Sequence, residues 1–253
     1  MASSEKYISL LNFLGSPYNI PYTSHRFQRV LIRETSIEVH QGQLHDNCKT
    51  GTIQAQMPLK RASFETIFEQ SAAVVIHDSM FARESILVET SEFWDHGGLE
   101  ALVEYFRHGG KVIVQVVEGI YAIGNILSSK FGCRWKLQAI DSGTAIVTER
   151  GRQMLGYSVP STVLLQGKAH FMRAPRVEAL ISKKVLDREE FIKQYQPDSE
   201  EEEEEYISYK KGEEGQHVIC IYEGFGSEGQ LIWNGDRGQN AVLKAAFEVL
   251  LKL

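Results

Sequence analysis

Lys111-Val112-Ile113-Val114-Gln115-Val116-Val117 is the stretch that decides the predicted fold. It is apolar on both faces and rich in β-branched residues, which is typical of a strand inside a parallel sheet. Before it a helix is predicted, because Gly109-Gly110 follows apolar residues at helical spacing, namely Leu99, Leu102, Val103 and Phe106. After it, Glu118-Gly119 turns the chain into a second helical pattern that ends at Gly132. The prediction is helix, buried strand, tight turn and helix in succession.

Other strands of this kind end at His77, Tyr222 and Trp233, with helices between them. Such alternation predicts the α/β class, here a mostly parallel sheet covered by helices on both faces, as in flavodoxin-like folds. Short alternating segments between residues 134 and 182 predict an antiparallel β extension of this sheet. We expect residues 1–253 to form one domain, since 253 residues with 43% hydrophobic content can bury a full core.

Near the N-terminus, the spacing of apolar residues predicts helical pieces at residues 7–14 and 24–33, followed by a strand at 36–40. Residues 41–58 are rich in Gly, Asp, Asn and Lys and are expected to form a loop. The last helix is expected to turn an apolar stripe toward the core: Val242, Ala245, Ala246, Val249, Leu250 and Leu253.

The composition narrows the range of functions. The net charge of -6 is carried mainly by an acidic run at residues 198–205, and no basic stripe is visible, so no nucleic-acid partner is expected. No apolar run reaches the ~18 residues of a membrane span, and no secretory signal is visible, so no membrane association is expected. Three scattered cysteines fit neither a disulfide framework nor a Cys-x-x-Cys metal site. This favours a reducing compartment, the cytoplasm, with the nucleus left open.

Two further segments bear on ligands and partners. The glycine-rich turn at residues 224–229 lacks the lysine and the Ser/Thr of a P-loop, and the histidines lack metal-binding spacings, so neither a cofactor nor a metal is predicted. Residues 197–215 are predicted to be a flexible acidic loop, because consecutive glutamates repel one another and bury no apolar surface. A solvated insertion is the simpler interpretation of this loop, and a contact site for a basic protein partner is the alternative.

The run from Leu99 to Gly132 resembles the class I glutamine amidotransferase-like superfamily, in which a helix ending in Gly-Gly leads into a hydrophobic strand, a sharp elbow and another helix. The glycine-rich turn before Leu231-Ile232-Trp233-Asn234-Gly235-Asp236 is similar to the trehalose-utilisation-type branch of that superfamily. The resemblance covers residues 70–135 and 216–253, and it implies the same α/β fold.

An amidotransferase of this type carries a nucleophilic cysteine at the elbow, in a Cys-x-Gly arrangement. Aligning Gly119 with that glycine places Val117 at the nucleophile position, and a shift of one residue places Glu118 there. Valine cannot attack an amide, and a carboxylate is a poor nucleophile for amide hydrolysis. Cys133 comes only after the elbow helix, so the nucleophile is absent and glutaminase activity is not expected.

Ligands of open α/β sheets bind outside the carboxyl ends of the strands. The residues expected there are His77, Asp78, Glu118, Tyr121, Glu223, Asp236 and Arg237. We take Glu118, His77 and Asp236 as catalytic candidates, because a carboxylate at the elbow can act as a general base or accept a hydroxyl. The other four are candidates for ligand binding.

Each candidate also has a simpler structural interpretation. Glu118 can cap the helix that follows it. His77 and Asp78 are neighbours on a strand and point to opposite faces, which makes a direct pair awkward. Asp236 and Arg237 can cap the last helix and form an ordinary ion pair.

Three functions remain open. The leading hypothesis is an amidotransferase-like pseudoenzyme that binds a protein partner or a small polar ligand at the elbow face. The second is a hydrolase or carbohydrate-modifying enzyme with Glu118 as acid/base, assisted by His77 or Asp236. The third is a structural subunit that binds another protein through the acidic loop and the aromatic segment at residues 18–22.

Overall fold

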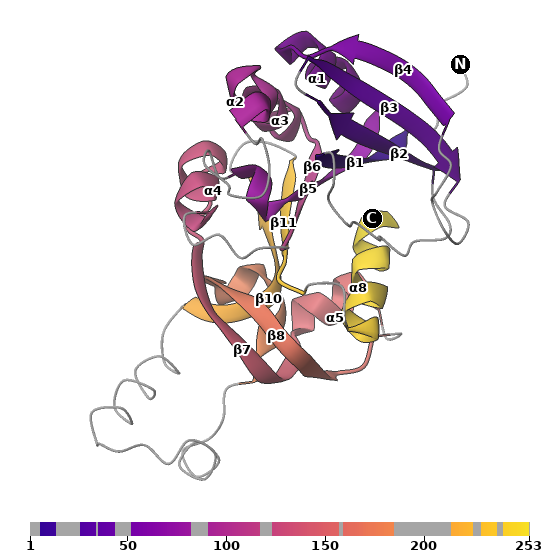
Figure 1. The fold of residues 1–253 in the computed structure, drawn as a ribbon. Coiled ribbons are helices and arrows are strands. Elements are labelled where there is room, and N and C mark those ends of the chain that lie inside the picture. The colour runs from indigo at the N-terminus through magenta and orange to yellow at the C-terminus, as the bar shows by residue number, and fades with distance from the viewer. Residues whose placement is uncertain are drawn as a thin grey trace, which may run out of the picture.

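Figure 1 shows the computed structural model, which describes residues 6–13, 26–33, 35–43, 52–81, 91–116, 123–156, 159–184, 214–224, 229–236 and 240–252. The described strands are β1 (Tyr7–Phe13), β2 (Arg26–Ile32), β3 (Ser36–Gln43), β4 (Thr52–Pro58), β5 (Ser71–His77), β6 (Lys111–Gln115), β7 (Lys136–Val147), β8 (Thr162–Pro175), β9 (Ala179–Lys183), β10 (Glu214–Glu223) and β11 (Gln230–Asn234). The described helices are α1 (Arg61–Glu69), α2 (Ser91–Asp95), α3 (Gly98–Arg107), α4 (Ile123–Phe131), α5 (Glu149–Leu155) and α8 (Ala241–Lys252), with short 3-10 turns η1 (Asp78–Phe81) and η2 (Arg176–Glu178).

The described strands form one sheet in the order β4-β3-β2-β1-β5-β6-β11-β10-β8-β7-β9. Its middle is parallel, because β2, β1, β5, β6 and β11 run in the same direction. Strands β3 and β4 continue it antiparallel at one end, and β10, β8, β7 and β9 do so at the other. Since β9 also pairs with β10, this second end closes on itself. Figure 1 shows the two antiparallel parts at opposite ends of the molecule.

The predicted fold class is wrong, because the sheet is mixed rather than mostly parallel. Among the described strands, seven pairings are antiparallel and four are parallel. The antiparallel strands are therefore the larger part of the sheet and not an extension of it. Neither the α/β class nor the flavodoxin-like description fits this architecture.

The N-terminal strands account for much of the error. Strands β1 and β2 occupy the segments predicted as helices. Ile8 and Leu10 face one side of the sheet and Leu11 faces the other, and all three side chains are buried. A strand buried on both faces has no clear period of two, so its apolar residues can imitate helical spacing.

Strand β4 lies in the region predicted as a loop and forms an outer edge of the sheet. The register between β3 and β4 shifts at Val39 and His40, which pair with Ala55 and Ile53, so Gln54 is the extra residue of a β-bulge. The strand ends at Pro58. Its edge is therefore bent in the middle and stopped by a residue that has no backbone N–H.

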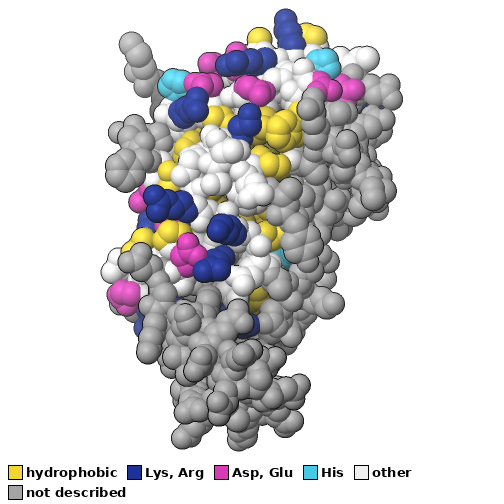
Figure 2. Space-filling model, turned by 90° about the vertical axis from the view of Figure 1, so that its left-hand side faces the viewer, with side chains coloured by type: hydrophobic (Ala, Val, Ile, Leu, Met, Phe, Trp, Pro, Cys, Tyr) yellow, Lys and Arg dark blue, Asp and Glu magenta, His cyan; other side chains and the backbone are white. Residues whose placement is uncertain are grey.

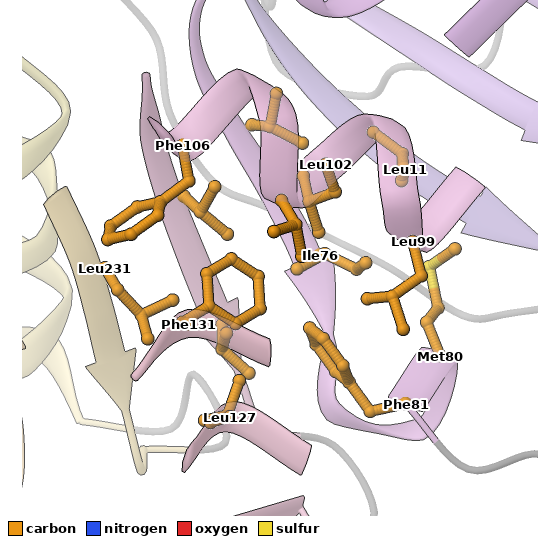
Figure 3. Packing of buried hydrophobic residues seen from close by; sticks show 14 of the residues in the cluster. Leu11, Ile76, Met80, Phe81, Leu99, Leu102, Phe106, Leu127, Phe131 and Leu231 are labelled. Carbon is orange, nitrogen blue, oxygen red and sulfur yellow. The ribbon is translucent and has the colours of Figure 1, made fainter. Parts of the chain in front are cut away.

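The larger apolar cluster lies beneath α1, α3 and α4 on one face of the sheet (Figure 3). Ile76 of β5 and Leu231 of β11 belong to it, together with Phe106 of α3 and Phe131 of α4. The rings of Phe106 and Phe131 meet edge to face with centroids 5.3 Å apart. Burying one side chain of this size contributes about 1.5–3 kcal/mol, so this cluster fixes α3 and α4 against the parallel strands.

The second apolar cluster lies on the opposite face, where α5 and α8 pack. Val75 and Ile113 of the parallel strands belong to it, with Leu243 and Phe247 of α8. The predicted last helix is confirmed, but its buried stripe is turned, since Ala245 is exposed while Leu243 and Phe247 are buried.

In the part of the chain that the structure describes, no helix is long and apolar enough to cross a membrane. Residues 197–213 of the predicted acidic loop lie outside the described residues, whereas Glu214 and Gly215 already belong to β10. The organisation as one domain stays a prediction.

Candidate functional site

Three buried polar side chains lie in a row where parallel strands end. His77 ends β5, Gln115 ends β6 and Asn234 ends β11. His77 and Asn234 are both register partners of Gln115. Register partners point to the same face, and neighbouring strands lie about 4.8 Å apart. All three side chains are buried, so they form a row of buried polar groups at the carboxyl ends of these strands, which we call the polar row.

Gln115 and Asn234 tie the ends of β6 and β11 together. Asn234 Nδ2 donates to Gln115 Oε1 at 2.7 Å, and Asn234 Oδ1 accepts from the backbone N–H of Asp236 at 3.2 Å. Gln115 Nε2 donates to the carbonyl oxygens of Asp236 and, at 3.3 Å, of Val116. The two amides therefore fix the path by which the chain leaves both strands.

Asp236 lies between this polar row and the start of α8. Its Oδ2 accepts from the backbone N–H of Asn240 at 3.3 Å. Asn240 caps α8, because its Oδ1 accepts from the N–H groups of Val242 and Leu243 at 3.0 and 3.3 Å. Through this bond with the Asn240 N–H, Asp236 supports the start of α8, which agrees with its interpretation as a structural residue near the last helix. Arg237 lies outside the described residues.

His77 is an uncharged imidazole in this setting. Burial lowers the pKa of His77 to about 3, so the side chain is neutral at physiological pH. Asp78 follows it as the first residue of η1 and is buried as well. A neutral imidazole offers one hydrogen-bond donor and one acceptor, and it cannot balance the charge of an anion.

Trp233 brings an unpaired donor to the same end of the sheet. It precedes Asn234 on β11 and is completely buried, and its Nε1 has no hydrogen-bond partner among the described residues. A Cβ atom placed on Gly235 would lie 3.1 Å from Nε1, so the indole N–H lies where the chain leaves β11. Burying an unpaired N–H costs about 1–3 kcal/mol, which makes this group a natural partner for an acceptor atom.

Glu223 lies at the other end of the sheet. Strand β10 runs antiparallel to β11, and Glu223 pairs with Gln230 at the beginning of β11. Its carboxylate forms an ion pair with Arg150 at 3.0 Å. The structure therefore separates Glu223 from the polar row. The sequence-based prediction placed it there because it took β10 as parallel to β11. Glu118 and Tyr121 lie outside the described residues.

The sequence pattern did not identify Gln115, Asn234 and Trp233 as residues of this site. The sequence does contain a sign that Gln115 is special, because this residue interrupts an otherwise apolar run from Val112 to Val117. A polar residue inside such a strand needs a hydrogen-bond partner in the core. The amide of Asn234 supplies it.

The described cysteines are not set up for nucleophilic chemistry. Cys133 and Cys220 are buried and not joined in a disulfide. Burial raises the pKa of Cys133 to about 12 and that of Cys220 well above its usual value. Both are therefore thiols rather than reactive thiolates. Cys48 lies outside the described residues, among which no group of three His, Cys, Asp or Glu could hold a metal ion.

Charges of both signs are mixed on the face of the molecule shown in Figure 2. Exposed ion pairs on the helices show the same mixing, with Arg61–Glu65 at 2.7 Å on α1 and Arg107–Glu104 at 2.9 Å on α3. Such exposed pairs contribute little to stability. Within each of these two pairs the opposite charges neutralise each other locally.

Comparisons with known protein families, with curated proteins and with solved structures found no match for this chain. The resemblance to the amidotransferase-like superfamily accordingly stays a prediction.

Proposed function

We propose that the protein binds a small, uncharged polar ligand at the carboxyl ends of β5, β6 and β11 and has no glutaminase activity. The observation that carries the proposal is the buried N–H of Trp233 at this end of the sheet, for which the described part of the chain offers no hydrogen-bond partner. A hydroxyl or carbonyl oxygen of a ligand would accept its hydrogen bond and remove the cost of burying it.

The polar row lies at the same end of the sheet but points to the face opposite Trp233, and its side chains favour a ligand without net charge. His77 is neutral because burial lowers its pKa to about 3, so it does not attract an anion. Asp78 and Asp236 are buried carboxylates that already have partners. Moving a charged ligand out of water costs several kcal/mol unless a free counter-charge receives it. Hydroxyl and amide groups avoid this cost.

The absence of glutaminase activity is proposed from the cysteines. The elbow sequence has Val117 and Glu118 where the superfamily has its nucleophile. The thiols of Cys133 and Cys220 are buried, and their raised pKa values keep them protonated. A protonated, enclosed thiol does not attack an amide.

A thermal-shift screen tests the binding proposal. The probes are monosaccharides, polyols and primary amides, each paired with a charged counterpart such as a sugar acid or a carboxylic acid. A ligand at 100 times its Kd stabilises the folded state by about 2.7 kcal/mol, which raises Tm by roughly 5–10 °C for a domain of this size. We expect such a rise with uncharged members of the panel and none with their charged counterparts.

Two tryptophan variants locate the site. Trp233→Phe removes the unpaired N–H, so it should abolish the ligand-induced rise in Tm. Trp135→Phe is the matched control, because Trp135 is equally buried but its Nε1 already donates to Glu178 Oε2 at 2.5 Å. It should lower stability and leave the ligand response intact. Loss of the response in both variants, or no response to any uncharged probe, would refute the proposal.

A further inference from the structure

His217 joins three strands at the antiparallel end of the sheet through one side chain. On β10 it is the register partner of Met172 on β8 and of Ser182 on β9. Its Nε2–H donates to the carbonyl oxygen of Ala174 on β8 at 3.0 Å, and its Nδ1 accepts from the hydroxyl of Ser182 at 2.8 Å. The carbonyl oxygen only accepts, so the ring proton is on Nε2 and Nδ1 is unprotonated. We call this arrangement the His217 bridge.

The imidazole is enclosed, and its charged neighbours do not favour protonation. The side chain is buried, and Arg176 on η2 acts on it as a like charge that opposes a second ring proton. The other charged groups of the surrounding elements have partners elsewhere: Arg173 with Glu214 at 2.6 Å, Glu178 with the indole of Trp135 at 2.5 Å, and Lys183 over the ring of Phe171 at 5.8 Å. A proton added to Nδ1 would therefore bury a cation without a carboxylate among these groups to balance it.

We propose that the His217 bridge is an acid-sensitive lock on β9, which opens when Nδ1 is protonated and releases β9 from β10 while the parallel centre stays folded. A protonated imidazole has two donors and no acceptor, so the bond from the Ser182 hydroxyl is lost. Strand β9 has five residues, and its pairing with β10 is already irregular between His217 and Cys220. On its other side β9 pairs with β7, and Thr148 donates to the carbonyl oxygens of Ala179 and Leu180, so the opening concerns only the contact between β9 and β10.

The direction of the pH effect follows from the two states. Burial lowers the pKa of His217 from 6.5 to about 4 in the closed state, whereas an opened, hydrated imidazole returns to the ordinary value. The closed state is thus fully favoured above pH 6.5 and loses stability as the pH falls toward 4. These two values predict an increase of about 30-fold in the opening of β9 between about pH 7.5 and pH 5.

Hydrogen exchange measured by mass spectrometry at the two pH values tests this lock. After correction for the intrinsic pH dependence of exchange, the peptide covering Ala179–Lys183 should exchange about 30-fold faster at the lower pH. The peptide covering Lys111–Gln115 in the parallel centre should exchange more slowly than that of β9 at both pH values, because it exchanges only when the whole sheet unfolds. Equal exchange rates of the two peptides at about pH 5 would mean global unfolding and would overturn the proposal, as would no rise in β9.

Two variants of the bridge and one control variant separate the bridge from other effects of acid. His217→Gln keeps one donor and one acceptor but does not titrate, so the pH-dependent exchange of β9 should disappear. His108→Gln, at an exposed position after α3, is the control and should retain it. Ser182→Ala removes only the contact to β9, so exchange of β9 should already be faster at about pH 7.5. Unchanged exchange in Ser182→Ala, or a full acid response in His217→Gln, would refute the lock.

Discussion

The pair formed by Gln115 and Asn234 gives a sharp test of how the end of the sheet is held. Gln115→Leu leaves Asn234 Nδ2 and the carbonyl oxygens of Val116 and Asp236 without their partner. Asn234→Leu leaves Gln115 Oε1 and the Asp236 N–H unpaired. In the double variant, the two side-chain groups that bonded each other are both absent.

The magnitudes follow from counting orphaned groups, each of which costs about 1–3 kcal/mol when buried. Gln115→Leu orphans three groups and should lower the free energy of unfolding by about 3 kcal/mol or more. Asn234→Leu orphans two groups and should cost about 2 kcal/mol or more. The double variant spares two of these groups, so it should be more stable than the sum of the single losses by about 2 kcal/mol.

The assay is equilibrium unfolding in urea. Measuring the parent, the two single variants and the double variant completes a double-mutant cycle. Gln28 provides the control, because it is a buried amide that bonds Ser9 at 2.6 Å in another part of the sheet. Gln28→Leu and Asn234→Leu should be additive within about 0.5 kcal/mol. Additivity of the Gln115 and Asn234 substitutions would show that the two amides do not act as a unit, and the reasoning would fail.

Three further predictions concern individual side chains. Because burial lowers the pKa of His77 to about 3, its contribution to stability is complete above pH 6.5 and declines as the pH falls toward 3. His77→Gln should therefore remove about 2 kcal/mol of the stability change between about pH 7.5 and pH 5 in urea titrations. Asn240→Ala should cost about 1 kcal/mol by removing the cap of α8, and Asn240→Asp should restore it, as thermal unfolding can show. In a Cys48→Ser variant, iodoacetamide should modify Cys133 and Cys220 only after unfolding, since both thiols are buried with raised pKa values; labelling of the folded chain would contradict this.

The centre of the fold was accessible from the sequence because burial leaves a strong local signal there. The run Lys111–Val117 does contain a parallel strand, β6, and the helix expected around Leu99 is α3. The direction of a strand leaves no comparable signal. Residues of β10 are as apolar as those of β6, yet β10 runs the opposite way to β11. Pairing partners far apart in the chain decide that direction, so the balance of parallel and antiparallel strands was out of reach.

The candidate site, too, could be predicted from the sequence only in part. The rule that ligands bind at carboxyl ends of strands selected His77 and Asp236, which the structure places at the end of β5 and just after the end of β11, two strands separated by β6. The same rule failed for Glu223, because its strand is antiparallel. No local pattern identifies the N–H of Trp233 as unpaired, since that depends on what surrounds the indole in three dimensions.

The shape of β4 has a consequence for behaviour at high concentration. An open outer strand is a template on which other molecules can add strands and grow fibrils. Here the bulge at Gln54 twists that template and Pro58 withholds a donor, while β9 closes the opposite end of the described sheet. The described sheet therefore resists intermolecular growth at both ends, and this resistance comes from backbone geometry, because β4 carries no charged side chain to repel a second copy.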